Sequence, residues 1–197
     1  MVRKTGLLCV LMMTLLLCAC RAGDSNSPQE RALSIRTNYL SAPGCTAQVK
    51  LTADYGRRVY HYEGTVTVSD RETLLTLTAP AEVAGVTARL SKESEQLEYD
   101  GAVVETGPLS HEGLTPLGAV PAVLEAARSG FMDSSTWETL DDATVLRVLC
   151  RDPSLSPGQG LETTLWFAPD SGALLLGELT LDGQQIVRCE FEQFTLL

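Results

Sequence analysis

Histidine is scarce in this sequence, and the residue patterns that most often carry catalysis are absent. Only two histidines occur among 197 residues. His61 lies between two tyrosines in a segment of alternating polarity, and His111 lies beside Glu112 in a stretch rich in glycine and proline, so both are expected at the surface. No Gly-x-Ser-x-Gly, His-Glu-x-x-His or phosphate-loop pattern occurs. We therefore expect a protein that is not an enzyme and needs no cofactor.

The chain also has few basic residues compared with acidic ones. Lysine and arginine number 15 against 25 acidic residues, which gives a formal net charge of -10. Residues 1–19 hold Arg3, Lys4 and no acid, so their removal would leave -10 - 2 = -12. An acidic surface repels nucleic acid and anionic lipid head groups. We expect no nucleic-acid partner, and any attachment to a membrane needs another device.

The first twenty residues provide such a device. Arg3 and Lys4 precede an uncharged run from Gly6 to Ala19, which is the layout of a secretory signal and is shorter than the roughly 20 residues of a membrane-spanning helix. Residues 17–20, Leu-Cys-Ala-Cys, resemble the lipobox of bacterial lipoproteins. The resemblance implies cleavage after residue 19 and lipidation of Cys20 by acyl chains such as palmitate, which would anchor the chain to the outside of the cell membrane. The alternatives are an ordinary cleaved signal and an uncleaved anchor.

Three cysteines remain after Cys20, and none has the spacing of a metal site. Cys45, Cys150 and Cys189 each share alternation parity with apolar neighbours, so each is expected on the buried face of a strand. An odd number allows at most one internal disulfide. Three free buried thiols are favoured over one disulfide, whose pairing stays open.

The rest of the chain alternates in the way of an antiparallel sheet. Residues 20–27 form a polar tether, and 28–197 form one domain. Ser27 and Pro28 predict the start of a helix over 28–41, and Pro121 predicts the start of a second over 121–128. Between and after them we expect strands at 45–53, 60–68, 73–78, 86–90, 97–99, 102–105, 136–140, 143–150, 161–168, 173–181 and 184–195. The fold class is α+β, with a strongly curved antiparallel sheet of about ten strands, a half-open barrel, covered by two helical segments.

The regular meander breaks at residues 107–134, and long irregular segments of compact domains are more often functional than idle. We predict a partner-binding loop before the second helix, although a lid without a ligand is the alternative. The loop residues are Leu109, Ser110, His111, Glu112, Gly113, Leu114 and Thr115. An apolar cavity could be lined by Tyr60, Tyr62, Tyr99, Leu117 and Leu124, although core packing of a half-barrel predicts the same residues.

Several short segments carry a resemblance to a known family. They combine a helix followed by two long strands, a Pro-x-x-x-x-Gly passage, an Asp-Gly turn, and paired closing strands with two further turns. The segments are Tyr39 to Tyr62, Ala79 to Val86, Tyr99 to Gly101, Leu165 to Phe167, Asp170 to Gly172, and Leu181 to Gly183. Together they resemble the LolA/LolB-like domains of lipoprotein-sorting proteins, and most of all the clostridial germination lipoproteins (GerS-like).

The resemblance implies two functions that the sequence leaves open. The first is a membrane-anchored, non-catalytic binding or scaffold lipoprotein of the cell envelope, acting on a cell-wall enzyme in spore germination. The second is a LolB-like acceptor that binds acyl chains, or a lipoprotein carrying them, in the sheet cavity. A soluble LolA-like carrier has no lipidated cysteine, so Cys20 argues against a free shuttle. An open, dry concavity would favour acyl chains, and one filled by the protein's own helices would favour a protein partner.

Overall fold

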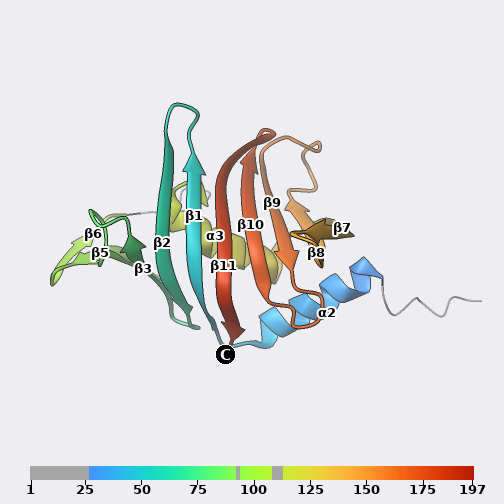
Figure 1. Ribbon diagram of the computed structural model, residues 1–197, viewed down its shortest axis with the longest axis horizontal. Helices are drawn as coiled ribbons and strands as arrows, with labels where there is room; N and C mark the ends of the chain where they lie inside the picture. The colour runs from blue at the N-terminus through green and yellow to red at the C-terminus, as the bar shows by residue number, and fades with distance from the viewer. Residues whose placement is uncertain (1–26, 92–93, 108–112) are drawn as a thin grey trace, which may run out of the picture.

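The computed structural model describes residues 27–91, 94–107 and 113–197 (Figure 1). The predicted lipidation site, Cys20, and four residues of the predicted loop, 109–112, lie outside this part of the chain. The remaining predictions can be compared with the structure residue by residue.

The described strands form one antiparallel sheet of eleven strands, in which the first and the last strand pair at the centre. From one edge to the other they are β6 (Ala102–Glu105), β5 (Glu95–Tyr99), β4 (Thr87–Ser91), β3 (Glu72–Ala79), β2 (Val59–Val68), β1 (Cys45–Asp54), β11 (Gln184–Leu196), β10 (Leu174–Leu181), β9 (Leu161–Phe167), β8 (Ala143–Arg151) and β7 (Met132–Leu140). The sheet is curved and unclosed, so the predicted α+β half-open barrel is confirmed, with eleven strands where about ten were expected.

Helix α2 (Pro28–Ser41) begins and ends where the sequence predicts. The Ser27 hydroxyl accepts a hydrogen bond from the Glu30 N–H at 3.2 Å, and Pro28 occupies the first helical position, where its missing N–H costs nothing. Tyr39 anchors the last turn, because its hydroxyl donates to the Gly172 carbonyl at 3.1 Å and its ring is buried.

Helix α3 (Pro116–Ser129) begins five residues earlier than predicted, so the predicted start at Pro121 is wrong. Thr115 caps it by accepting a hydrogen bond from the Gly118 N–H at 3.1 Å, and Pro116 takes the first position. Pro121 lies inside the helix, where it removes one backbone hydrogen bond. Pro116 follows Thr115, which can cap a helix, whereas Pro121 follows Val120, which cannot, so the cap residue marks Pro116 as the start.

Helix α3 covers the concave face of the sheet and supplies much of the core. Figure 1 shows it crossing behind the central strands, while α2 lies along the lower right edge beside β7 and β8. The buried side of α3 carries small and branched residues that pack against β1, β9, β10 and β11. These residues are Gly118, Ala119, Val120, Val123, Leu124 and Ala127.

Cys45, Cys150 and Cys189 are free and buried, as favoured from the sequence. Cys45 stands opposite Leu196 and Cys189 opposite Leu51, so the two thiols are six residues apart along one strand pair, or about 20 Å. Cys150 lies in β8, separated from β11 by β9 and β10. These spacings exceed the roughly 7 Å between Cα atoms that a disulfide tolerates.

The convex face is polar and carries cross-strand ion pairs. Lys50 and Glu192 lie 2.5 Å apart, and Arg188 lies 2.6 Å from Glu178 and 2.9 Å from Glu190. The Lys50–Glu192 pair is exposed and contributes little to stability, whereas the Arg188–Glu178 pair is partly buried. None of the helices in the described ranges has the length and hydrophobicity needed to cross a membrane.

Candidate functional site

The concave face is occupied by the protein's own helix rather than left open. Val120 and Val123 of α3 are fully buried against the sheet, and α3 lies so close to β10 that Gly177 has no room for a side chain. What remains for a ligand is a set of hollows along the flanks and the first turn of α3. Three of them are large enough to receive a side chain or a small molecule.

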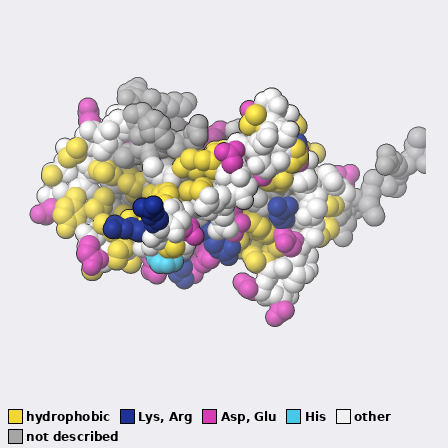
Figure 2. Space-filling view, turned by 90° about the horizontal axis from the view of Figure 1, so that it is seen from above, with side chains coloured by type: hydrophobic (Ala, Val, Ile, Leu, Met, Phe, Trp, Pro, Cys, Tyr) yellow, Lys and Arg dark blue, Asp and Glu magenta, His cyan; other side chains and the backbone are white. Residues whose placement is uncertain are grey.

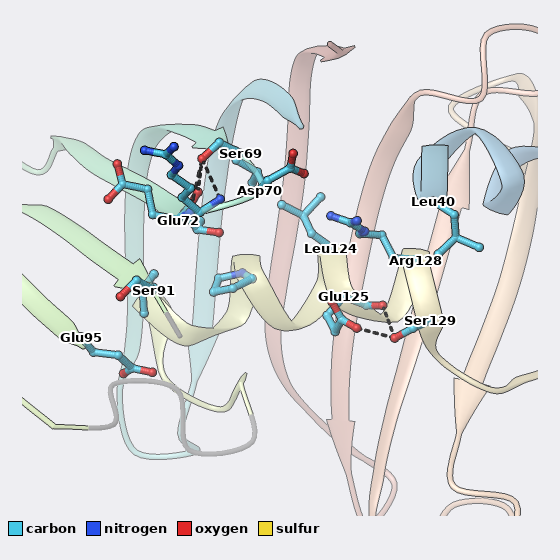
Figure 3. Close-up of a pocket in the computed structure, with 15 residues that line it drawn as sticks. Leu40, Ser69, Asp70, Glu72, Ser91, Glu95, Leu124, Glu125, Arg128 and Ser129 are labelled. Carbon is cyan, nitrogen blue, oxygen red and sulfur yellow. Dashed lines mark hydrogen bonds between the residues drawn. The ribbon is translucent and has the colours of Figure 1, made fainter. Parts of the chain in front are cut away.

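The first hollow, of about 680 Å³, lies between α3 and the turns that join β2 to β3 and β4 to β5 (Figure 3). Figure 3 shows Ser69, Asp70 and Glu72 facing α3 across it, with Arg128 and Leu124 on the helix side. Several of its polar groups are paired within the protein. Glu72 accepts from Arg89 at 2.6 Å, and Glu125 accepts from the Ser129 hydroxyl. We call it the polar hollow.

The second hollow, of about 690 Å³, lies on the other flank of α3 and is mainly apolar. Pro121 and Ala122 of α3 form one wall, and Leu155, Leu161 and Leu181 form the other. We call it the apolar groove. Its lining offers surface for hydrocarbon or for apolar side chains and little for directional recognition.

The third hollow, of about 270 Å³, lies beneath the first turn of α3 and is lined mainly by apolar side chains. Tyr62 forms one wall, and its ring contacts the ring of Tyr60, which in turn contacts the ring of Tyr55. The Tyr62 and Tyr60 rings stack with centroids 6.4 Å apart, and the Tyr60 and Tyr55 rings are 6.1 Å apart. We call Tyr55, Tyr60 and Tyr62 the tyrosine rim and the hollow the rim cavity; its lining residues are Tyr62, Leu77, Val83, Val86, Thr115, Pro116 and Leu117.

The five residues predicted to line one apolar cavity are distributed over three places. Tyr62 and Leu117 meet in the rim cavity, and Tyr60 stacks on Tyr62 at its mouth. Leu124 is 5% exposed and faces the polar hollow. Tyr99 is 54% exposed at the β5–β6 turn, where its ring lies against Gly85.

The described end of the predicted binding loop is held in place by α3 and the tyrosine rim. Gly113 is buried with φ +74°, and a Cβ there would stand 2.4 Å from the Ala122 Cβ. The Leu114 carbonyl accepts a hydrogen bond from the Tyr55 hydroxyl at 2.9 Å, and Thr115 caps the helix. These three residues therefore join α3 to the β1–β2 turn, while a binding role for Leu109 to Glu112 stays a prediction.

The groups that could act as nucleophiles or metal ligands are buried or dispersed. Burial raises the pKa of the Cys45 thiol to about 11 and also raises the pKa values of Cys150 and Cys189. Such thiols are protonated at neutral pH and react slowly. His61 lies on the exposed face, with Nδ1 3.1 Å from the Thr52 hydroxyl. The described ranges contain no cluster of three His, Cys, Asp or Glu side chains able to hold a metal ion.

The β1–β2 turn carries a feature that the sequence prediction did not include. Arg57 and Arg58 lie between Tyr55-Gly56 and Val59-Tyr60, and all six residues are exposed. The available signal was a pair of adjacent arginines between tyrosines in an acidic chain. The sequence alone does not show what lies near this turn. The structure places the turn beside the start of α3, through the hydrogen bond from Tyr55 to Leu114.

Comparisons with known proteins show likeness of fold without closeness of sequence. No protein-family model and no curated protein matches the chain. An uncharacterized conserved protein from Thermus thermophilus matches with a TM-score of 0.51 and 9% identity, covering 87% of this chain and 88% of that chain. A LolA superfamily protein from Nitrosomonas europaea matches with a TM-score of 0.43 and 12% identity, covering 84% and 93%.

A third similar structure is the CwlD amidase from Clostridioides difficile in complex with the GerS lipoprotein. It matches with a TM-score of 0.41 and 9% identity, covering 90% of this chain and 100% of that chain. Identities this low concern the fold alone. At the level of the fold, the predicted LolA-like resemblance is confirmed.

Proposed function

We propose that this protein is a non-catalytic binding protein, anchored outside the cytoplasm by a lipid on Cys20, that presents the surface around α3 to a protein partner. The observation that carries the proposal is the position of α3. Because Val120 and Val123 are fully buried against the sheet, the protein's own helix takes the place that an enclosed ligand would occupy. A concavity filled in this way leaves its rim and flanks as the surface available for binding.

Charge and chemistry support a partner that is a protein. The acidic chain disfavours nucleic acid. The thiols are buried, and the polar hollow contains groups that already bond to one another. Tyrosine and arginine side chains at the β1–β2 turn are residue types enriched at protein interfaces.

A cell-wall enzyme of spore germination is the first partner class to test. This choice rests on the resemblance of the sequence to GerS-like lipoproteins, whose fold implies a partner role for a cell-wall amidase. A lipid anchor on Cys20 would hold the protein at the surface where such an enzyme works.

The test is chemical cross-linking of the full-length, membrane-anchored protein in the cells that produce it. Mass spectrometry then identifies both cross-linked protein and co-purified lipid. We expect one extracytoplasmic protein cross-linked to residues around α3 and no stoichiometric lipid. One acyl lipid per protein, with no cross-linked protein, would contradict the proposal.

Acyl-chain binding is the second candidate, and the apolar groove favours it. Its volume of about 690 Å³ lies within the roughly 300–1,000 Å³ of small-molecule sites. Ala122 is partly buried and lies in its wall, so Ala122→Trp would place a large side chain in the groove. Loss of co-purified lipid in that variant, with unchanged partner cross-linking, would establish lipid binding as a separate activity.

A further inference from the structure

We propose that the tyrosine rim, with Arg57 and Arg58, is the docking site for an acidic segment of a partner protein that inserts one apolar side chain into the rim cavity. This inference rests on the proposed function and names the surface and the chemistry of the partner. Three observations carry it. Arg57 and Arg58 form no ion pair within the described ranges. The rings of the tyrosine rim are in contact in sequence, and the rim cavity beside Tyr62 has the size of one side chain.

The two arginines are unpaired in a chain rich in acid. Within the described ranges neither Arg57 nor Arg58 forms an ion pair or a side-chain hydrogen bond, although acidic residues outnumber basic ones by ten. Most other described cations are used internally: Arg89, Arg147, Arg151, Arg188 and Lys50 form ion pairs, and Arg31 and Arg36 donate to backbone carbonyls. Arg71 and Arg128 likewise form no ion pair within the described ranges, but neither is adjacent to a second arginine. Two adjacent free guanidinium groups are thus complementary to an acidic partner.

The turn that carries the arginines is held in a defined position. The Asp54 carboxylate accepts from the Gly56 N–H at 2.7 Å, and the Tyr55 N–H donates to the Arg58 carbonyl at 3.0 Å. The Tyr55 hydroxyl ties the turn to the start of α3 through Leu114. A turn fixed at both ends loses little conformational freedom on binding, which favours affinity.

The tyrosine rings lead from the arginines to the cavity. Tyr60 is 36% exposed, whereas Tyr62 is half-buried, so the exposure of the tyrosine side chains decreases from the turn toward the cavity. Rigid aromatic side chains beside arginines are the usual composition of an interface hot spot. Figure 2 looks onto this end of the molecule and shows basic side chains beside a hydrophobic area.

The size of the rim cavity selects a side chain rather than a whole lipid. Its volume of about 270 Å³ falls just below the roughly 300–1,000 Å³ of sites for complete small molecules. Leu77, Val86 and Leu117 give it an apolar wall, which suits a leucine or phenylalanine anchor. In Figure 1 the β1–β2 turn lies at the top of the sheet, and α2 lies along its lower right.

The experiment uses three short synthetic peptides and the full-length protein in lipid nanodiscs. One peptide carries a phenylalanine flanked by glutamates, the second replaces the phenylalanine with serine, and the third replaces the glutamates with lysines. Fluorescence anisotropy should show saturable binding of the first peptide and binding at least about tenfold weaker for the other two. Equal binding of all three would overturn the proposal.

Variants then locate the site. The double variant Arg57→Glu/Arg58→Glu and the variant Tyr60→Ala should each weaken binding of the first peptide by roughly tenfold. Arg71→Glu, a charge reversal at the exposed turn at the other end of β2, is the matched control and should leave binding unchanged. An equal loss of peptide binding in Arg71→Glu would show a non-specific charge effect and overturn the site. Unfolding of the double variant or of Tyr60→Ala at a temperature that explains its loss of binding would also overturn it.

Two further outcomes separate this site from the alternatives. The wild-type protein could instead bind vesicles that contain phosphatidylglycerol and fail to bind the peptide. If the double variant also lost this vesicle binding, the surface would be assigned to a membrane, and the proposal would be overturned. A cross-linked partner captured equally by wild type and the double variant would also overturn it, while leaving the proposed function intact. Loss of that cross-link in the double variant, but not in Arg71→Glu, would support both.

Discussion

Val123 of α3 lies directly over Gly177 of β10, so closely that a Cβ on Gly177 would stand 2.4 Å from Val123 Cγ1 and 2.9 Å from Cγ2. Valine in a helix is stiff about its first side-chain torsion, so it cannot swing aside. The backbone of the sheet is therefore the surface on which α3 rests. This contact, more than any single apolar residue, leaves no space for a ligand under the middle of the helix.

Adding a methyl group at that contact should destabilise the domain. We expect Gly177→Ala to lower the free energy of unfolding by about 1–3 kcal/mol, because Val123 must move away from β10. Urea denaturation measures the loss. The double variant Gly177→Ala/Val123→Ala should recover part of it, and a Gly177→Ala protein as stable as wild type would show that α3 is not seated as described.

Arg36 links the two helices and supplies the next prediction. Its guanidinium donates to the Ala126 carbonyl at 3.2 Å and the Ala127 carbonyl at 3.4 Å, in the last turn of α3, where the Ala126 carbonyl also accepts from the Gly130 N–H. We expect Arg36→Met to cost about 1–2 kcal/mol of stability. Arg57→Met removes an exposed arginine without such partners, and its urea midpoint should stay at the wild-type value.

The cysteines should be slow to react in the native protein. Burial raises the pKa of Cys45 to about 11 and shields all three thiols, so an aromatic disulfide reagent should label a protein that starts after Cys20 only slowly at neutral pH. Denaturation should expose three reactive thiols. A count of one after denaturation without reductant would reveal a disulfide and contradict the separation of these residues in the sheet.

Membrane attachment should depend on Cys20. The expected anchor is the acyl group on that cysteine, so Cys20→Ser should move the protein from the membrane fraction to the soluble fraction. Fractionation followed by immunoblotting measures the shift, with Cys45→Ser as the matched control. Retention of the Cys20→Ser protein in the membrane would exclude a lipid anchor at this residue.

The predicted binding loop can be tested without disturbing α3. Replacing 109–112 with glycine and serine, while keeping Gly113, Leu114 and Thr115, should abolish partner cross-linking at an unchanged unfolding temperature. Thr115→Ala should behave in the opposite way, losing about 1 kcal/mol of stability with the helix cap while cross-linking persists. Cross-linking that survives the loop replacement would remove Leu109 to Glu112 from the binding surface.

Local patterns predicted most of the elements. Alternation from Cys45 to Val68 marks β1 and β2, and the signals at Ser27 and Pro28 mark the start of α2, because each depends on neighbours a few residues away. The start of α3 was predicted at the wrong proline, because the cap residue Thr115 before Pro116 was not weighed against Val120 before Pro121.

The candidate site was predictable only in part. Tyr62 and Leu117 were expected to line a cavity and do meet. The hydrogen bond from Tyr55 to Leu114, by contrast, joins segments 59 residues apart, which local patterns do not reveal. The contact between Val123 and Gly177 is likewise invisible to periodicity. A glycine within a strand signals a close approach, without saying of what.

The pairing of β1 with β11 also determines how the chain can be completed. Strands β1 to β6 form one meander and β7 to β11 another, each from neighbours in sequence, and the bonds between β1 and β11 alone join the halves within the sheet. The strand that unites the halves, β11, is therefore made after all the other strands of the sheet. A chain that stops before Gln184 would carry two separate sheets, each with an extra unprotected edge open to pairing with other chains, so premature termination would yield aggregating fragments rather than a shortened domain.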